Sequence, residues 1–236
     1  MLSIDLQNKD CFDFLSTIKD NSVDLILTDP PYYISRDSGF TYTKVEKYAK
    51  HTIDFGEWDN GEQLDYQKIV NECYRVLKKS GTLIMFYDLW KITELKQCIE
   101  NAKFVQLRFI EWIKTNPVPI NSKLNYLTNS REIALTCVKG GKPTFNSEYD
   151  NGIYSHSICQ DAGRFHPTQK PIKLIEELIK KHSNENNLVL DCFAGSGTTA
   201  VACQNLKRAF IGCEINKEYF DKAIMRIKDN QKGFNF

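Results

Sequence analysis

The residues best suited to chemistry are Asp29, Pro30, Pro31 and Tyr32, which follow a short apolar run at 23–27. A run that is rich in branched side chains and stopped by two prolines is typical of a buried strand that ends in a rigid turn. In open α/β sheets, ligand sites lie just beyond the carboxyl ends of such strands. One carboxylate and one fixed carbonyl can accept both hydrogens of an exocyclic amine, and the Tyr32 ring can lie flat on a planar base. Taken alone, these residues also fit a simple turn, because aspartate and proline favour turns for local reasons.

A glycine-rich turn within residues 187–200 is the second candidate site. The run 187–191 is typical of a buried strand that ends at Asp191, and a helix is expected to begin near Gly197. Glycines let the backbone approach a ligand closely, and a helix N-terminus offers unpaired amides to an anionic group. A further strand at 209–213 ends at Glu214, which is placed to bind a ribose diol. This order of elements indicates a site for a nucleoside cofactor.

The same turn leaves a dinucleotide site open as an alternative. Gly195, Gly197 and Ala200, with Glu214 about twenty residues further on, also fit the fingerprint of NAD-binding proteins. Asp191 argues against NAD, because it would face the pyrophosphate with like charge, and it suits the ammonium of a methionine group instead. A dehydrogenase would also leave residues 29–32 unexplained.

Composition limits the class of protein. The 236 residues, with 42% hydrophobic side chains, predict one α/β domain with an insertion or at most two lobes. The eight cysteines include no Cys-x-x-Cys pair and have no histidine at metal spacing, which predicts reduced core thiols in a cytoplasmic protein and no metal site. No apolar segment has the length or continuity of a signal peptide or a membrane span. The net charge of +1 neither demands nor excludes a nucleic acid.

The apolar periodicities predict the elements that must position these motifs. Strands are expected at 2–6, 23–28, 82–87, 104–113, 131–138, 187–191 and 209–213, and helices near 12–18, 64–79, 89–100 and 172–182. Ser80 and Gly81 are expected to end the second of these helices. Residues 33–60 and 140–165 show no period, and irregular stretches of this length are usually functional or mobile loops. The first of them interleaves basic and aromatic residues, which suits phosphates and displaced bases.

Three motifs in a fixed order resemble a known family, the β-class DNA amino-methyltransferases that use S-adenosylmethionine. The motifs are residues 29–32, 166–171 and 191–199, and the likeness extends over nearly the whole chain. It implies a Rossmann-like methyltransferase sheet of seven strands in an α/β fold, mostly parallel, with an antiparallel edge and a circularly permuted motif order. It also implies a single catalytic domain, 1–236, with DNA-contacting insertions at 33–60 and 114–165.

The resemblance assigns roles residue by residue. Its catalytic residues are Asp29, Pro30, Pro31 and Tyr32, and its cofactor-binding residues are Asp10, Cys11, Thr168, Lys170, Asp191, Phe193, Gly195, Ser196, Gly197, Thr198 and Glu214. Asp10 and the Cys11 amide would bind the adenine edge of the cofactor, although Asp10 can equally cap the helix that follows it. Thr168 and Lys170 would hold the methionine carboxylate, and Asp191 the methionine amino group.

The activity implied is methyl transfer to the N6 amine of a flipped-out adenine in double-stranded DNA. Asp29 favours adenine, because serine is more typical of the cytosine-N4 members at this position. The alternatives are cytosine-N4 methylation, an RNA or protein amino-methyltransferase, a dehydrogenase, and a DNA-binding module without turnover. A homodimer and a cognate restriction endonuclease are further partners that the family suggests, whereas the target sequence cannot be read from the chain.

Overall fold

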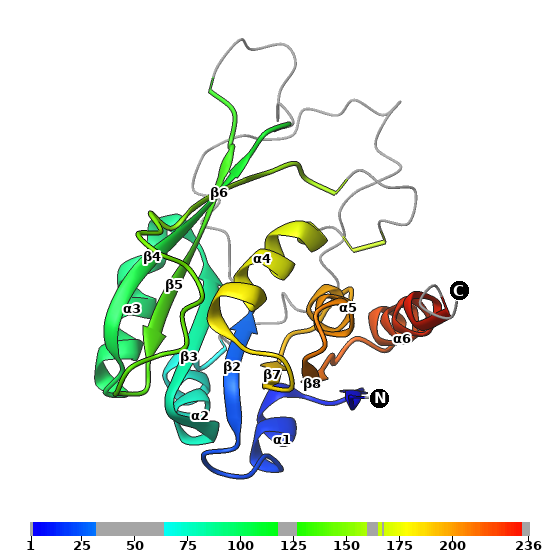
Figure 1. Ribbon diagram of the computed structural model, residues 1–236, viewed down its shortest axis with the longest axis horizontal. Helices are drawn as coiled ribbons and strands as arrows, with labels where there is room; N and C mark the ends of the chain where they lie inside the picture. Colours follow the sequence, from blue (N-terminus) through cyan, green and yellow to red (C-terminus); the bar gives the residue numbers. More distant parts are fainter. Residues whose placement is uncertain (1, 32–63, 118–126, 160–164, 167, 233–236) are drawn as a thin grey trace.

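The computed structural model describes residues 2–31, 64–117, 127–159, 165–166 and 168–232 (Figure 1). The strands and helices are β1 (Ile4–Gln7), α1 (Cys11–Ser16), β2 (Val23–Thr28), α2 (Tyr66–Val76), β3 (Leu77–Tyr87), the 3-10 turn η3 (Leu89–Lys91), α3 (Ile92–Asn101), β4 (Val105–Lys114), β5 (Arg131–Val138), β6 (Ile153–His156), α4 (Ile172–His182), β7 (Leu188–Asp191), α5 (Thr198–Asn205), β8 (Ala209–Cys213) and α6 (Lys217–Lys232).

One sheet of eight strands organises the fold, in the order β1-β8-β7-β2-β3-β5-β4-β6. Neighbours from β1 to β3 are parallel, whereas β5 runs antiparallel to both β3 and β4. The predicted mostly parallel sheet with an antiparallel segment is confirmed. The central strands β2 and β7 are neighbours in the sheet although they lie far apart in the sequence. This arrangement brings the first and third motifs together, as the permuted motif order predicts.

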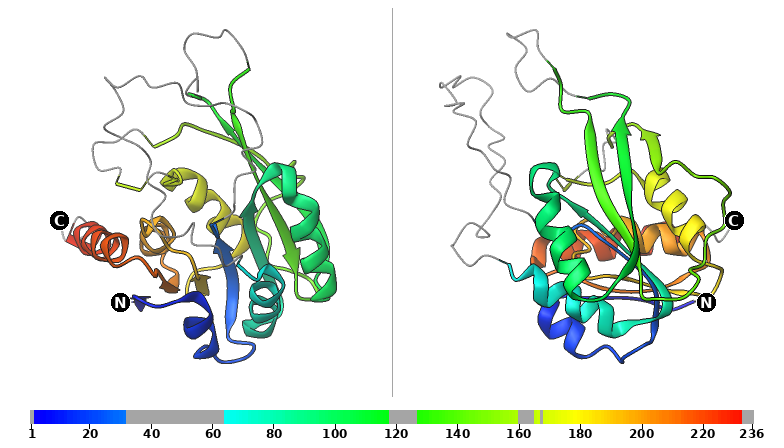
Figure 2. Two further views of the ribbon diagram at one scale, coloured as in Figure 1. Left: turned by 180° about the vertical axis from the view of Figure 1, so that it is seen from behind. Right: turned by 90° about the vertical axis from the view of Figure 1, so that its left-hand side faces the viewer.

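Helices cover both faces of the sheet (Figures 1 and 2). Buried side chains of α4, α5 and α6 form one hydrophobic cluster with the sheet, and those of α1, α2 and α3 form the other. The central strand β2 is almost wholly buried because helices lie on both sides of it. This burial explains why residues 25–27 are all apolar rather than alternating with polar residues.

The eighth strand, β6, lies inside the stretch 140–165, which the sequence predicts to be irregular. It pairs in parallel with β4, where Trp112 lies opposite Tyr154, and the indole of Trp112 donates to the His156 carbonyl at 2.9 Å. Its four residues are too few for an alternating pattern to stand out. The interval 114–165 therefore contributes β5 and β6 to the sheet in addition to its loops.

The prediction that Ser80 and Gly81 end a helix is wrong. Helix α2 ends at Val76, and β3 begins at once with Leu77, which is fully buried and pairs with Val23. Ser80 has a φ of 70°, and its amide donates to the carbonyls of residues 139 and 140. The pair forms an irregularity inside a strand of eleven residues, where the register with β2 shifts.

The helices of the C-terminal part agree with the sequence in part. Helix α4 has the predicted bounds, whereas α6 was not predicted. All eight cysteines are free thiols, and six of them are buried. Within the described ranges, no group of three or more His, Cys, Asp or Glu side chains could hold a metal ion. No helix in the described part of the chain is both long and apolar enough to cross a membrane.

Candidate active site

The first and third motifs meet at the centre of the sheet, where β2 and β7 lie side by side. The connection from β7 leads through α5 to β8, and the connection from β2 leads through α2 to β3 on the opposite side. Strand order therefore reverses between these two strands, and ligands of open α/β sheets bind in the crevice at such a point. The hydroxyl of Thr28 donates to Oδ1 of Asp191 at 2.8 Å, which links the two strand ends directly.

Asp29 follows β2, and its carboxylate is paired with the Lys170 ammonium. Oδ2 of Asp29 accepts a hydrogen bond from Lys170, whose Nζ also lies 3.0 Å from Oε2 of Glu132. The Lys170 side chain is only 7% exposed, and its Nζ lies 4.8 Å from the centroid of the Phe86 ring. Burial raises the pKa of Asp29, Lys170 opposes this, and Glu132 adds to it; the pKa of Asp29 lies above its usual value. The second motif thus reaches the first through Lys170.

The other oxygen of Asp29 is an unfilled acceptor. Among the described residues, Oδ1 of Asp29 is buried and accepts no hydrogen bond. Leaving a buried acceptor unsatisfied costs about 1–3 kcal/mol, and more when it is charged. A ligand N–H donor at this oxygen would remove that cost, so the atom suits the hydrogen of an amine.

Glu132, on β5, extends this charge cluster away from Asp29. Its Oε1 lies 2.7 Å from Nζ of Lys114, while its Oε2 faces Lys170. Burial acts to raise the pKa of Glu132, but Lys170 and Lys114 outweigh it, and the pKa lies below the usual value. Sequence reasoning missed Glu132 and Lys114, because no local pattern shows that two strands and a distant turn bring their charges together.

Asp191 is held by the chain's own donors. Its Oδ1 accepts from Thr28 and from the Phe193 amide at 3.1 Å, and its Oδ2 accepts from the Thr199 hydroxyl at 2.7 Å. A carboxylate has about four acceptor positions, so about one remains for a ligand ammonium. Burial raises the pKa of Asp191 to about 6 despite these hydrogen bonds, and the nearby Asp29 charge adds to the rise.

The glycine turn is fastened to Glu214 at the end of β8. The Gly195 amide donates to Oε2 of Glu214 at 2.8 Å, and the Asn216 amide donates to Oε1 at 2.9 Å. Glu214 is buried, which raises its pKa. Gly195 has a φ of +49°, and a Cβ there would lie 3.4 Å from Nε2 of His166. The turn therefore needs a glycine for its backbone, and the second motif lies directly against it.

Ser196 and Thr198 complete the turn, and both are buried. Their hydroxyls are 3.0 Å apart, and Arg226 of α6 donates to the Thr198 hydroxyl at 2.9 Å and to the Ser196 carbonyl at 3.0 Å. Gly197, with a φ of +72°, packs closely against Ala223 of α6, since a Cβ at Gly197 would lie 3.1 Å from Cβ of Ala223. Arg226 is a further residue that the sequence did not single out, because α6 was not predicted.

The remaining predicted cofactor residues lie at the turns around this site. Asp10 caps α1, its Oδ1 accepting from the Phe12 amide at 2.7 Å. Cys11 is buried; burial raises the pKa of its thiol, and the nearby Cys192 adds to the rise. Thr168 is exposed, with its hydroxyl 3.2 Å from Nδ1 of His166. None of these three is in a described hydrogen bond with the other predicted site residues.

Two prolines hold the backbone after Asp29. Pro30 is buried and Pro31 exposed, and the Tyr66 hydroxyl donates to the Pro31 carbonyl. The Tyr66 ring packs edge-on against Tyr87, with centroids 4.9 Å apart and planes at 84°. Tyr66 thereby fixes the turn from the start of α2. Tyr32, the fourth predicted catalytic residue, lies outside the described residues.

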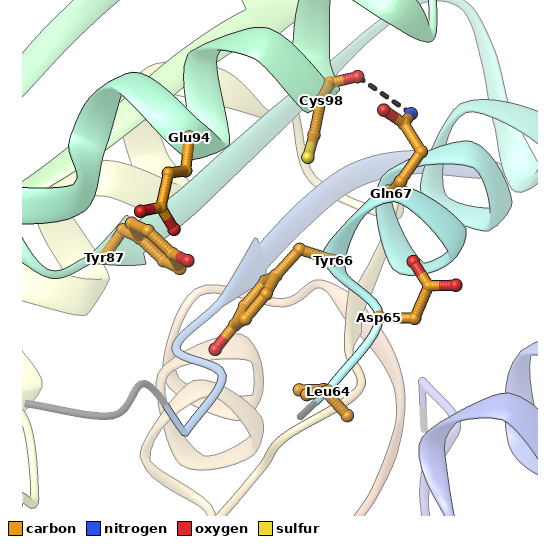
Figure 3. Close-up of a pocket in the computed structure, with 7 residues that line it drawn as sticks. All are labelled: Leu64, Asp65, Tyr66, Gln67, Tyr87, Glu94 and Cys98. Atoms are coloured by element: carbon orange, nitrogen blue, oxygen red, sulfur yellow. Dashed lines mark hydrogen bonds between the residues drawn. The ribbon is translucent and has the colours of Figure 1, made fainter. Parts of the chain in front are cut away.

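A pocket of about 360 Å³ lies on the Tyr66 side of this turn (Figure 3). It is lined by Leu64, Asp65, Tyr66, Gln67, Tyr87, Glu94 and Cys98. None of the predicted cofactor or catalytic residues lines it. Tyr66 connects this pocket to the predicted catalytic turn, because its hydroxyl donates to the carbonyl of Pro31.

Known proteins share both this sequence and this fold. The family described as DNA methylase, of N6/N4 type, matches residues 23–225. The type II methyltransferase M2.DpnII of Streptococcus pneumoniae is 33% identical over 94% of this chain and 89% of its own length. The type II methyltransferase M.HinfI of Haemophilus influenzae is 30% identical over 93% of this chain and 67% of its own length. The crystal structure of the M1.HpyAVI–SAM complex has a TM-score of 0.72 and 29% identity, covering 94% of this chain and 98% of that one.

The family match covers all of the first and third motifs; in the first, Oδ1 of Asp29 is buried and has no hydrogen bond among the described residues, and in the third, the Gly195 amide donates to Glu214. The chain belongs to the N6/N4 DNA methylase family and is a DNA methyltransferase that uses S-adenosylmethionine.

Proposed function

We propose that the methylated group is the exocyclic N6 amine of adenine, in a base flipped out of duplex DNA. The observation that carries the chemistry is the buried, unfilled Oδ1 of Asp29. The choice of adenine rests on aspartate at the first motif position, which is the form more typical of adenine-N6 members of the family.

Asp29 and Pro30 would activate the amine by accepting its two hydrogens. An aromatic amine is a poor nucleophile, because its lone pair is delocalised into the ring. Hydrogen bonds to the Asp29 carboxylate and the Pro30 carbonyl would make the nitrogen more tetrahedral and turn its lone pair out of the ring plane. The rate would then come from positioning and electrostatics, with no covalent enzyme intermediate. Tyr32 would stack on the flipped base.

The glycine turn and its neighbours would hold the cofactor, which supplies an electrophilic methyl group when bound. Residues 193–198 would wrap its methionine and sugar portions, and Glu214 would bind the ribose hydroxyls. The backbone at Gly195 supports this fit, because its φ of +49° requires a glycine, and a glycine leaves the backbone of the turn uncovered by a side chain. Asp191 retains about one acceptor position for the methionine ammonium.

Asp10, Cys11, Thr168 and Lys170 are assigned to the cofactor by the resemblance alone. Asp10 with the Cys11 amide would bind the adenine edge, and Thr168 the methionine carboxylate. Lys170 at that carboxylate stays a prediction, since its ammonium pairs with Asp29 and Glu132.

The DNA would lie against the loops in 33–60 and 114–165, within a single catalytic domain. A homodimer, a cognate restriction endonuclease and a cytoplasmic location also belong to this proposal. Sedimentation with and without DNA tests the dimer, and a strictly monomeric profile in both cases would count against it.

The decisive experiment is to incubate the protein with radiolabelled S-adenosylmethionine and unmethylated genomic DNA, and to identify the labelled nucleoside after digestion. We expect label in N6-methyladenine, and none with Asp29→Ala. Label in N4-methylcytosine would overturn the base assignment and keep the role of Asp29. Full activity of Asp29→Ala would overturn that role. Cofactor binding without DNA label would redirect the search to RNA or protein amines.

A further inference from the structure

Four charged side chains form a continuous chain that ends at the proposed catalytic carboxylate. Lys114 of β4 lies 2.7 Å from Glu132 of β5, Glu132 lies 3.0 Å from Lys170, and Lys170 pairs with Asp29. The charges alternate in sign along the chain and sum to zero. Two strands of the antiparallel edge are thus connected electrostatically to the end of β2.

These four charged side chains are largely shielded from solvent. The exposed fractions of the side chains are 15% for Lys114, 24% for Glu132, 7% for Lys170 and 21% for Asp29. By contrast, the surface pair Lys96–Glu100 is 51% and 54% exposed. Exposed pairs are screened by water, whereas buried pairs interact much more strongly. A change of charge at Lys114 therefore alters the electrostatic potential at Asp29.

Lys170 is shared between two carboxylates. Its ammonium lies between Oδ2 of Asp29 and Oε2 of Glu132, with the Phe86 ring on a further side. Without Glu132, the lysine charge would no longer be shared between these two carboxylates. Without Lys114, Glu132 would draw Lys170 more strongly toward itself. The position of the lysine depends on both residues.

We propose that Glu132 and Lys114 are positioning residues for methyl transfer, which hold the Lys170 ammonium in place beside Oδ2 of Asp29 and so keep the other oxygen of Asp29 open to the substrate amine. Neither residue is assigned a contact with substrate or cofactor. This inference rests on the proposed role of Asp29 as the amine acceptor.

The two residues act on Asp29 with opposite sign. Among the described residues, the charged groups that face Asp29 are Lys170 before α4, Glu132 on β5 and Asp191 on β7, with Lys114 acting through Glu132. Glu132→Gln removes a negative charge and leaves Lys170 to Asp29, so the pKa of Asp29 should fall. Lys114→Met leaves the Glu132 charge uncompensated, so the pKa of Asp29 should rise.

The test compares Glu132→Gln and Lys114→Met with the matched control Glu111→Gln. Glu111 lies on β4, is 27% exposed and pairs with Arg131 at 3.3 Å, outside the chain of charges. For each variant, kcat is measured against pH, cofactor affinity by calorimetry, and folding by thermal melting. Carbon-13 carboxyl shifts, assigned by comparison with Asp29→Asn, report the titration of Asp29 without turnover.

We expect the acid limb of the kcat profile to move to lower pH in Glu132→Gln and to higher pH in Lys114→Met, by about one unit each. At the optimum, kcat should fall roughly tenfold in both, as for a misplaced reacting group, with cofactor affinity unchanged. The carboxyl titration of Asp29 should move the same way. If Glu132→Gln does not fold, the upward shift in Lys114→Met decides the proposal.

Unshifted profiles like that of Glu111→Gln, or shifts of equal sign, would overturn the inference. Asp29→Asn separates this failure from a failure of the proposed function. If Asp29→Asn is inactive while the two variants show no shift, only the inference fails. If Asp29→Asn turns over as well as the wild type, the role of Asp29 fails and the inference with it.

Discussion

The Thr28 hydroxyl donates to Oδ1 of Asp191 at 2.8 Å, between the ends of two adjacent parallel strands. Both side chains are buried, with exposed fractions of 2% and 4%. Thr28 directly precedes Asp29, so one hydrogen bond connects the strand that carries the proposed amine acceptor to the strand that begins the cofactor turn. The relative position of the two proposed half-sites therefore depends on a residue that belongs to neither motif.

Thr28→Val should weaken cofactor binding and lower stability. The substitution removes a buried donor and leaves an oxygen of Asp191 with one hydrogen bond fewer, which should cost about 1–3 kcal/mol of unfolding free energy. Calorimetry should show a cofactor Kd raised by about tenfold, equivalent to roughly 1.4 kcal/mol. Thr28→Ser keeps the donor and should stay within about threefold of wild type. Equal affinities in Val and Ser variants would show that the hydrogen bond does not support the cofactor site.

Cofactor affinity should fall on acidification through about pH 6. The pKa of Asp191 is raised by burial to about 6, so its carboxylate is charged above that pH and neutral below it. Only the charged form can pair with the methionine ammonium. Calorimetry from pH 8 to pH 5 should show a constant Kd above pH 7 and about tenfold weakening per pH unit well below the pKa. Asp191→Asn should bind weakly and without this pH dependence; a wild-type Kd that stays constant to pH 5 would contradict the assignment.

Gly195→Ala should impair cofactor binding beyond its effect on stability. Its φ of +49° disfavours any side chain, and the new Cβ would stand 3.4 Å from Nε2 of His166, in a turn that is proposed to contact the cofactor. Left-handed backbone costs a non-glycine residue about 1–2 kcal/mol.

Gly140→Ala is the matched control for this change, with a φ of +63° and nothing within 4 Å of the added Cβ. We expect the two variants to lose similar stability in thermal melts, but only Gly195→Ala to lose cofactor affinity. Equal cofactor affinities would mean that the turn does not contact the ligand.

Local patterns were sufficient for every described strand except β6 and for most of the described helices. Helix α4 has the predicted bounds because Pro171 marks its start and the apolar spacing continues to its end. Strand β2 was predicted because burial on both faces makes residues 25–27 continuously apolar. The prediction that Ser80 and Gly81 end a helix was wrong because such a turn-forming pair can lie within a strand as well as after a helix. Only the pairing of Leu77 with Val23 distinguishes these two cases.

Long-range contacts of the site could not be predicted from the same patterns. Lys170 was placed on the cofactor carboxylate by resemblance, whereas its ammonium contacts Asp29, 141 positions earlier in the chain. Glu132, Arg226 and Tyr66 have no local signal, since each acts on a segment that only the tertiary fold brings near. The motifs predict which strand ends carry the chemistry, and the structure adds the neighbours that contact them.

Tyr66→Phe should slow methyl transfer without affecting the cofactor. The Tyr66 hydroxyl donates to the Pro31 carbonyl, and its removal frees the turn that carries the proposed amine-accepting carbonyl of Pro30. A phenylalanine ring keeps the edge-on packing against Tyr87, so stability should change by less than about 1 kcal/mol. We expect kcat to fall by about five- to tenfold, the equivalent of one lost hydrogen bond of roughly 1 kcal/mol, with an unchanged cofactor Kd.

Tyr74→Phe is the matched control, because Tyr74 lies in the same helix and packs edge-on against Phe104, with ring centroids 5.0 Å apart. This variant should turn over like the wild type. Identical kcat values in the two variants would show that the Tyr66 hydroxyl does not hold the catalytic turn in place.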